Sequence, residues 1–476
     1  MASQSPGTSS RYRLRELGLL ILPFLILLIA MTQLLVGGPG SNPQAPFSPK
    51  SLPTLQDIMP VLGLIGALLV ANIVMSIFFR KADQFLLPLA GLLSGIGVLM
   101  ATRLGPNLAI VRSPDGVPLK GLETLGTKQL GWVLIGLALC LATVFILRST
   151  NWLERYKYTW IVVGFLALLP SVIAGIRTIR TNAPTRDILG VGPFQLQPSE
   201  LLKIAIIIFF AGYLSENRDI FSQGYMRMGR LRLPPLRQLG PLILMLGLAL
   251  IIFLVVRELG LALLIYGLFL SMMYLGSGKI SYVLVSLGLF ALLAIIGYSL
   301  FGYVRARFAT VTFDFINWQK WTPAQQDFAQ NGGAQVLQGL IALASGGILG
   351  SGLGLGHPAF VPVVESDMIF TGLGEELGLA GLFAIIGIYL LIVYRGYRIA
   401  IEATNPFNQL LAAGLTTIFA IQTLIISLGN MKLMPLTGIP LPFLSYGGSS
   451  LFANYIIIGI LLRISYNTAM ERDGTG

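Results

Sequence analysis

Apolar residues along the chain gather into long runs, which short polar, glycine-rich or proline-rich breaks separate. Several runs reach the roughly 20 residues that an α-helix needs to cross about 30 Å of hydrocarbon. The runs and breaks predict twelve transmembrane helices, at residues 16–36, 58–79, 84–102, 128–148, 159–177, 199–215, 237–256, 259–277, 280–301, 367–394, 408–429 and 445–465. The fold class is therefore predicted to be an all-α polytopic membrane protein, because helices satisfy their backbone hydrogen bonds inside a bilayer.

Composition supports a membrane protein. Of the 476 residues, 55% are hydrophobic and 11% are charged, whereas soluble domains carry roughly 25% charge. The formal charge of +12 would suit nucleic acid, but the basic residues are scattered between apolar runs and form no aromatic-interleaved module. Basic loops that flank membrane helices are the simpler interpretation. The single cysteine, Cys140, excludes a disulfide within the chain and a redox dithiol.

The first apolar run, from Leu17 to Val36, follows Arg11, Arg13 and Arg15 and so imitates a secretory signal. It is longer than a usual signal core and no small-x-small cleavage site closes it, which predicts an uncleaved first span. An even number of spans puts both termini on one side. The positive-inside rule then predicts that both termini are cytoplasmic, since arginine and lysine are enriched on the side of these first arginines.

Arginines also lie on the predicted outer side. They form three clusters: Arg177, Arg180 and Arg186; Arg257; and Arg305 with Arg307. Two interpretations stay open. The arginines are solvated loop charges, or they hold a phosphorylated ligand through bidentate hydrogen bonds, which a lipid pyrophosphate would suit.

The longest stretch outside the predicted spans, residues 302–366, is much longer than an ordinary connection and indicates a functional outer loop. Within it, residues 332–356 are apolar and rich in glycine. They predict either a re-entrant helix packed against the bundle or an interfacial helix. The segment lacks the sequence pattern and the βαβ context of a nucleotide-binding loop, so close backbone packing explains its glycines better than phosphate binding.

Ionisable residues inside predicted spans point to function, because they are costly in hydrocarbon. The first group lies in residues 197–203 (QPSELLK). Its proline and serine predict a helix start, and Glu200 suits the positive end of the helix dipole. Lys203 follows Glu200 by three residues and therefore shares its helix face. An ion pair at the helix end, with Lys203 snorkelling to the surface, is the alternative to a functional pair.

Two further charged groups lie at the ends of predicted spans. Arg257 and Glu258 occupy a tight outer turn between two apolar runs, where the proton affinity of Glu258 depends on a cationic neighbour. Asp367 begins a later span, and Glu375 and Glu376 lie deeper in it. Adjacent glutamates point in different directions, so at least one is expected to face the protein interior. Such carboxylates suit a general base on a sugar hydroxyl and equally a proton or ion path in a transporter, and both interpretations stay open.

Other chemistry has little support in the sequence. His357 is the only histidine, which excludes a multi-histidine metal site and a mechanism with two histidines. The GxSxG elbow of serine hydrolases is absent from the sequence. No set of metal ligands is predicted.

Residues 435–450 (PLTGIPLPFLSYGGSS) are nearly the carboxy-terminal signature of the SEDS family of cell-wall glycosyltransferases. Three further segments agree with that family in order and spacing: residues 194–203 (FQLQPSELLK), 256–264 and 366–378 (SDMIFTGLGEELG). The chain therefore resembles this family over residues 84–466. The resemblance divides the chain into a cytoplasmic tail with two additional helices (1–80), a ten-helix SEDS-type core that includes the outer loop (81–466), and a second cytoplasmic tail (467–476).

The resemblance implies a peptidoglycan glycosyltransferase of a bacterial cytoplasmic membrane, with a role in cell shape and elongation or in division. Such an enzyme polymerises lipid II, carried on undecaprenyl pyrophosphate, at the outer face of that membrane. It works with a class B penicillin-binding transpeptidase. The alternatives are a lipid flippase or transporter, and a catalytically weak scaffold for the transpeptidase. Internal repeats, which many transporters have, are not evident.

The resemblance also assigns residues. Glu258 stands where the family has its catalytic aspartate, and Lys203 is the lysine expected beside it. The predicted substrate-binding residues are Arg186, Gln197, Glu200, Arg257, Ser366, Asp367, Glu375, Lys432, Thr437, Ser445, Gly447, Gly448 and Ser449. A divalent cation, Mg²⁺ or Mn²⁺, is an optional helper of the arginines at the leaving pyrophosphate.

The chain departs from the family pattern at two places. Arg257 and Glu258 replace the usual proline and aspartate, so the carboxylate is one methylene farther from the backbone and follows a cation. Glutamate keeps a carboxylate of similar intrinsic pKa, whereas a misplacement of about 1 Å costs on the order of 100-fold in rate. Arg186 is followed by Asp187 rather than by the tryptophan usual in the family.

Overall fold

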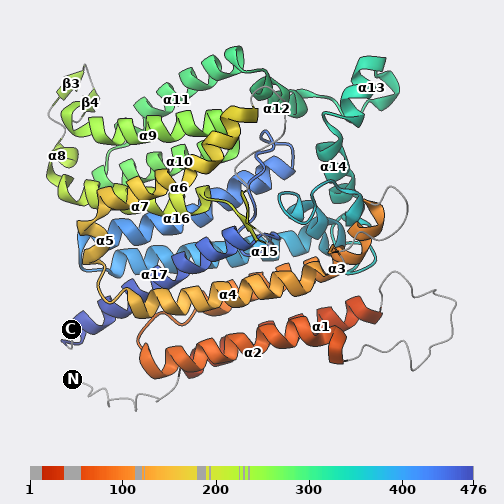
Figure 1. Cartoon of the computed structure of the whole chain (residues 1–476), viewed down its shortest axis with the longest axis horizontal. Coiled ribbons are helices and arrows are strands. Elements are labelled where there is room, and N and C mark those ends of the chain that lie inside the picture. Colours follow the sequence, from red (N-terminus) through yellow and green to blue (C-terminus); the bar gives the residue numbers. More distant parts are fainter. Residues whose placement is uncertain are drawn as a thin grey trace.

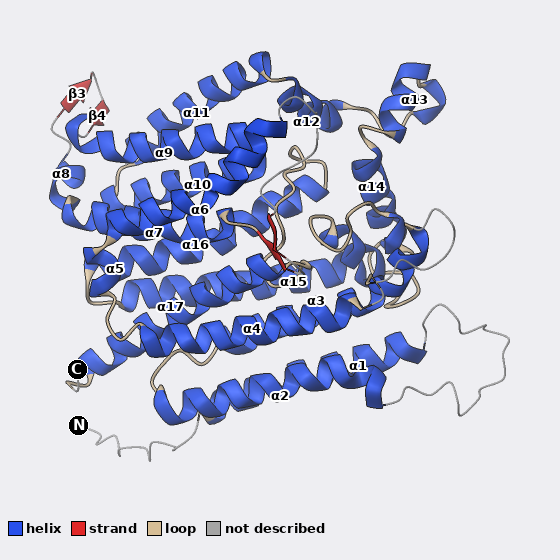
Figure 2. Ribbon diagram, viewed as in Figure 1, coloured by secondary structure: helices blue, strands red, loops and turns tan. Residues whose placement is uncertain are grey.

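The computed structural model describes residues 13–36, 55–112, 121–122, 124–178, 189–191, 194–223, 226–228, 231–233 and 236–474. Most of these residues are helical (Figure 1, Figure 2). The α-helices are α1 (Leu14–Val36), α2 (Leu55–Phe78), α3 (Leu86–Val111), α4 (Leu125–Ile146), α5 (Asn151–Arg155), α6 (Lys157–Thr178), α7 (Ser199–Glu216), α8 (Arg218–Gln223), α9 (Leu236–Val256), α10 (Leu259–Ser277), α11 (Ile280–Leu300), α12 (Gly302–Thr312), α13 (Pro323–Gln330), α14 (Ala334–Gly346), α15 (Ile369–Glu402), α16 (Pro406–Asn430) and α17 (Gly448–Arg472). The remaining elements are the 3₁₀ turns η3 (Trp318–Lys320) and η4 (Pro358–Phe360) and the strands β1 (Leu189–Val191), β2 (Phe194–Leu196), β3 (Met226–Met228) and β4 (Leu231–Leu233).

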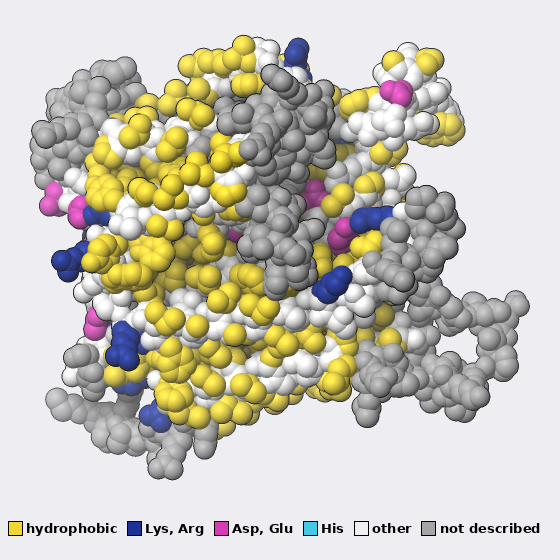
Figure 3. Space-filling view, viewed as in Figure 1, with side chains coloured by type: hydrophobic (Ala, Val, Ile, Leu, Met, Phe, Trp, Pro, Cys, Tyr) yellow, Lys and Arg dark blue, Asp and Glu magenta, His cyan; other side chains and the backbone are white. Residues whose placement is uncertain are grey.

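The long helices lie side by side in a bundle (Figure 1). Each of the twelve predicted spans coincides with a long helix: α1 to α4, α6, α7, α9 to α11 and α15 to α17. Within the described ranges, nine of these helices are long and apolar enough to cross a membrane. In the space-filling view, hydrophobic side chains cover the sides of the bundle, and many charged ones lie toward its ends (Figure 3). The predicted all-α polytopic membrane fold is confirmed.

The other three predicted spans are helices with special features. In α6 and α9 the described apolar stretches are shorter, Lys157–Ile173 and Leu239–Ile251. α7 carries three charged residues, Glu200, Lys203 and Glu216. Ionisable side chains at membrane depth need partners inside the bundle, so the helices that pack against α7 have to supply polar groups.

Burial differs sharply between the helices. In the apolar stretch of α16, 83% of the residues are buried inside the bundle, whereas in the apolar stretch of α11 only 6% are buried. α16 contacts α7, α10, α15 and α17, so side chains on it reach several helices at once. α11 lies at the edge of the bundle (Figure 1).

Two small antiparallel hairpins interrupt the helical pattern. β1 pairs with β2, with Leu189 opposite Leu196, and β3 pairs with β4, with Met226 opposite Leu233. The apolar pattern predicts neither hairpin, because three residues are too few to show the alternation that marks a strand.

The predicted outer loop contains α12, α13 and α14, and its glycine-rich part packs against α15. α15 is interrupted at Gly378, where φ is 68°. A Cβ on Gly350 would lie 2.2 Å from the carbonyl oxygen of Glu376, and Gly350 itself has a φ of +85°, so glycine is required there. The N–H of Leu379, beyond the interruption, donates to the carbonyl of Gly347 at 3.0 Å. These glycines therefore serve close backbone packing, as predicted, and α14 lies against α15.

The start of α1 and the end of α17 lie at the same end of the bundle (Figure 1). Arg13, just before α1, donates to the carbonyl of Asp83, between α2 and α3. Lys81 pairs with Asp473, just after α17, with 2.6 Å between Nζ and Oδ2. Three connections lie at the opposite end of the bundle: the one before α7, the one between α9 and α10, and the one between α16 and α17. Each is separated by one long helix from the end where α1 starts and α17 ends. The division at residue 80 stays a prediction.

Candidate functional site

Lys203 is held inside the bundle by two polar partners. α7 begins at Ser199 after Pro198, as the sequence predicts, and this places Glu200 and Lys203 on one helix face. The Lys203 Nζ lies 2.5 Å from Glu200 Oε2 and 3.1 Å from Gln422 Oε1 on α16. Both side chains of the ion pair are fully buried. Lys203 therefore does not snorkel to the surface.

Gln422 extends this contact to the loop between α16 and α17, residues 431–447, which we call the signature loop. The Gln422 Nε2 donates to the carbonyl of Pro440 at 2.7 Å. Buried charged and polar groups are tolerated only when they are paired. A continuous chain of hydrogen bonds from Glu200 through Lys203 and Gln422 to Pro440 therefore fixes the ammonium group and joins α7, α16 and the signature loop.

The turn between α9 and α10 packs against the same loop. Arg257 has a φ of 62°, in the left-handed region, and the buried Glu258 directly precedes α10. A Cβ on Gly260 would lie 2.5 Å from the carbonyl oxygen of Thr437 and 2.6 Å from Ile439 Cγ1. Glycine at this position therefore lets the start of α10 touch the signature loop.

Gln422, which binds Lys203, and Gly260, two residues after Glu258, both contact one short stretch, residues 437–440. α10, which begins directly after Glu258, also contacts α7 and α16. Two predicted catalytic residues, on segments distant in sequence, are brought to the same part of the bundle.

Two arginines approach Tyr303 of α12. The Arg257 guanidinium carbon lies 5.8 Å from the centre of the Tyr303 ring, which is within cation–π range. Arg307 Nη1 donates to the carbonyl of Leu436 at 2.5 Å. Burial raises the pKa of Tyr303, and the charges of Arg257 and Arg307 oppose that shift. Arg305, by contrast, is exposed. α12 therefore brings positive charge against the signature loop.

Asp367 and Arg307 both approach Gly438 of the signature loop. A Cβ on Gly438 would be 3.9 Å from Arg307 Nη1 and 3.9 Å from Asp367 Oδ2. Burial raises the pKa of the Asp367 carboxyl to about 6, although the amide of Gln335, 3.3 and 3.4 Å from its two oxygens, opposes the shift. A carboxyl group that titrates near neutral pH beside an arginine is a candidate for proton transfer or for binding a sugar hydroxyl.

Several predicted binding residues hold the signature loop in place. Ser445 Oγ accepts the N–H of Leu441 at 2.7 Å and donates to the carbonyl of Ser366 at 2.6 Å. Ser449 Oγ accepts the N–H of Gln197 at 2.9 Å. The loop is therefore tied to the residues before α15, and the start of α17, which follows the loop, is tied to the residues before α7.

Other residues of the signature differ in their surroundings. Lys432 Nζ donates to the carbonyl of Phe313 at 2.5 Å, so it holds the chain that follows α12. A Cβ on Gly448 would lie 3.0 Å from the indole ring of Trp132, whereas one on Gly447 would meet nothing within 4 Å. Among these residues, Gly447 has open space where a side chain would begin.

The paired glutamates of α15 both face the protein interior and bind the glycine-rich segment. The N–H of His357 donates to Glu375 Oε1 at 2.7 Å. Arg103 Nε donates to Glu376 Oε1 at 3.1 Å, and Arg103 Nη2 donates to the carbonyl of Gly356 at 2.8 Å. Arg103 is a functional candidate that sequence reasoning missed. The sequence feature that could have pointed to Arg103 is a positive charge inside an apolar stretch that continues to the end of α3.

Arg186 lies outside the described residues. Over the residues that the structure describes, no group of three His, Cys, Asp or Glu side chains is placed to share a metal ion. A divalent cation, Mg²⁺ or Mn²⁺, stays a prediction.

The fold and the site define a polytopic α-helical membrane protein with a buried lysine and carboxylates beneath a loop rich in proline and glycine. The FtsW, RodA and SpoVE family model, described as "Cell cycle protein", matches residues 83–470. The chain belongs to this family, the SEDS family that its motifs indicate.

Relatives with curated names are similar over most of the chain. The peptidoglycan glycosyltransferase RodA of Mycobacterium tuberculosis (strain H37Rv) is 35% identical over 397 residues, which are 83% of this chain and 80% of the relative. Stage V sporulation protein E of Bacillus subtilis (strain 168) is 32% identical over 338 residues, 68% of this chain and 83% of the relative.

Solved structures share the fold. A chain of a peptidoglycan synthase complex, described as coordinating polymerization and crosslinking, matches with a TM-score of 0.58 and 21% identity over 81% of this chain and 98% of that chain. The rod shape determining protein RodA of Thermus thermophilus matches with a TM-score of 0.51 and 22% identity over 81% of this chain and 96% of that chain.

Proposed function

We propose that this protein is a peptidoglycan glycosyltransferase that polymerises lipid II at the outer face of the bacterial cytoplasmic membrane, in cell shape and elongation or in division. Its relatives of that name are 35% identical over 83% of the chain. The observation that supports the mechanism is that residues 437–440 contact both Gln422, which binds Lys203, and Gly260, which follows Glu258 by two residues. A reaction between two lipid-linked sugars needs such groups fixed beside each other.

In the proposed reaction, Glu258 is the general base. Its carboxylate accepts the proton of the acceptor hydroxyl as that oxygen attacks the anomeric carbon of the donor sugar, and the bond from this carbon to the pyrophosphate oxygen breaks. Lys203, immobilised by Glu200 and Gln422, positions the carboxylate. Glu258 is a catalytic residue, and Lys203 acts through it.

The leaving pyrophosphate takes up negative charge, which preorganised cations stabilise. Arg257 and Arg307 lie near Tyr303 and the signature loop. A guanidinium group can bind two phosphate oxygens at once through two parallel hydrogen bonds. The open side of Gly447 gives the pyrophosphate access to the loop. Mg²⁺ or Mn²⁺ carried in with the pyrophosphate would add to this charge.

The proposed orientation puts the site outside and both termini in the cytoplasm. Arg13, Lys81 and Asp473 lie at one end, and the signature loop lies at the other. The division into residues 1–80, 81–466 and 467–476 is part of this proposal. So is a class B penicillin-binding transpeptidase as partner, which the shared fold with a chain of a peptidoglycan synthase complex supports.

Proteoliposomes test the function against the flippase alternative. Labelled lipid II is added to the outer leaflet of vesicles that contain the purified protein and its transpeptidase, with penicillin present to block crosslinking. Glycan strands of many disaccharides are the expected product. Translocation of the label without strand formation would show a flippase. If the protein neither translocates lipid II nor forms strands while a related enzyme is active in the same assay, the scaffold alternative is the one that remains.

A further inference from the structure

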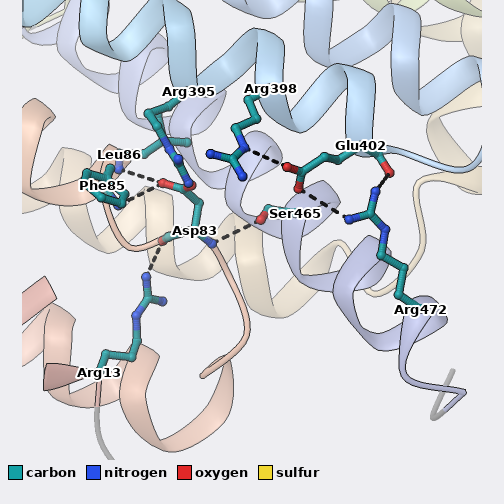
Figure 4. A network of polar contacts seen from close by, with 9 residues as sticks. All are labelled: Arg13, Asp83, Phe85, Leu86, Arg395, Arg398, Glu402, Ser465 and Arg472. Carbon is teal, nitrogen blue, oxygen red and sulfur yellow. Dashed lines mark hydrogen bonds and ion pairs between the residues drawn. The ribbon is translucent and has the colours of Figure 1, made fainter. Parts of the chain in front are cut away.

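A second polar region lies at the end of the bundle away from the site. A cavity of about 430 Å³ opens there between α1, the α2–α3 connection, α15 and the end of α17, and we call it the basic cavity. Figure 4 shows Arg395, Arg398 and Arg472 directed toward Asp83 and Glu402. The charged residues of its lining are Arg15, Lys81, Arg395, Arg398 and Arg472, which are cationic, and Asp83, Glu402 and Asp473, which are anionic.

Every anion of the basic cavity already has a cationic partner. The pairs are Asp83 with Arg395, Asp473 with Lys81, and Glu402 with both Arg398 and Arg472. The lining therefore keeps an excess of two positive charges. The guanidinium of Arg15 is exposed and makes no hydrogen bond or ion pair with another residue of the described chain. An anion that enters the cavity thus meets positive charge that the protein leaves uncompensated.

The face of α1 that carries Arg15 continues as an apolar stripe. The residues at helical spacing after Arg15 are Leu19, Leu22, Ile26 and Ile29, which are 37%, 65%, 46% and 65% exposed. A phosphate at the cavity and a hydrocarbon chain along this stripe fit one molecule. A soluble anion would gain nothing from the stripe, which favours a lipid.

We propose that the basic cavity binds the phosphodiester headgroup of an anionic glycerophospholipid, with Arg15 paired to the phosphate and an acyl chain along the exposed face of α1. Basic pockets between membrane helices are suited to such headgroups. Because the lining comes from α1, α15 and α17, the bound lipid ties the first helix to helices of the matched family region.

Lipid binding to the purified full-length protein tests this proposal. Native mass spectrometry in detergent measures how tightly dioleoyl phosphatidylglycerol and dioleoyl phosphatidylcholine bind. The variant Arg15→Gln removes one of the two excess positive charges and breaks no hydrogen bond or ion pair of the described chain. Arg155→Gln is the matched control, because Arg155 is exposed on α5 and does not line the cavity.

Phosphatidylglycerol is expected to bind more tightly than phosphatidylcholine, and Arg15→Gln to weaken its binding about fivefold, the effect of one basic residue near an anionic surface. Arg155→Gln should bind like the wild type. Equal binding of the two lipids, or equal binding by both variants, would overturn the proposal. Displacement of phosphatidylglycerol by millimolar glycerol 3-phosphate would also overturn it, since the site would then belong to a soluble phosphate.

Discussion

Removing the Lys203 ammonium should expose how much the buried chain of hydrogen bonds contributes. In Lys203→Met, the Glu200 carboxylate loses a partner at 2.5 Å and Gln422 Oε1 loses a donor at 3.1 Å. Because the Glu200 side chain is fully buried, its charge has no access to water in place of the lysine. Breaking one partner of a buried ion pair costs about 3–5 kcal/mol, so Lys203→Met is expected to unfold at a clearly lower temperature.

The double variant Lys203→Met with Glu200→Gln separates stability from function. Replacing both members of a buried pair by neutral side chains is often close to neutral, so the double variant should recover most of the lost stability. Its polymerisation of lipid II should stay reduced on the order of 100-fold, the effect of a misplaced catalytic group, because the cation that we propose positions Glu258 is still missing.

Thermal unfolding in detergent and strand formation in proteoliposomes measure the two effects. Lys128→Met on α4 is the control, since Lys128 is exposed. The reasoning is refuted if Lys203→Met is as stable as the control, or if the double variant polymerises lipid II at the wild-type rate.

Three further variants test other parts of the structure. Gly350→Ala should lose about 1–3 kcal/mol of stability in thermal unfolding, because its Cβ would lie 2.2 Å from a carbonyl oxygen and its φ is +85°. Gly387→Ala is the control, since a Cβ there would have open space. An equal loss of stability in both variants would contradict the close packing at Gly350. Burial raises the pKa of Asp367 from 3.8 to about 6, so the folded protein holds this proton more tightly and stability falls as pH rises between these values. Asp367→Asn should remove that part of the pH dependence of unfolding, and an unchanged profile would speak against it. Arg103→Leu leaves the buried Glu376 carboxylate without its cation and should speed hydrogen exchange at residues 350–357; unchanged exchange would show that the arginine does not hold this segment.

The sequence predicts the helices well, because a long apolar run has few ways to satisfy its backbone in a bilayer other than as a helix. Three helices continue well beyond their predicted ends: α15 reaches Glu402 rather than residue 394, α17 reaches Arg472 rather than residue 465, and α3 shows the largest difference. The pattern predicts an end at residue 102, whereas α3 continues to Val111. Arg103 imitates the end of a span, and its partner Glu376 lies 273 residues later in the chain. A local sequence pattern therefore cannot show that Glu376 neutralises the charge of Arg103.

The candidate site was predictable only where its contacts are local or its motifs are shared with the family. The spacing of Glu200 and Lys203 predicts their pairing, and the motifs point to Glu258. Gln422 is 219 residues from Lys203 and carries no charge that would mark it inside an apolar run. The bond from Lys432 to the chain after α12 likewise depends on how the outer loop folds back.

Strand formation by variants at position 258 tests the central claim most directly. Wild type, Glu258→Asp and Glu258→Gln are purified with the transpeptidase partner and supplied with lipid II in the presence of penicillin. Loss of a general base costs about 10²–10⁴-fold in rate. We expect long glycan strands from the wild type and from the aspartate variant, and a loss in that range for the glutamine variant. Polymerisation by Glu258→Gln at the wild-type rate would contradict the assignment of Glu258 as the catalytic base.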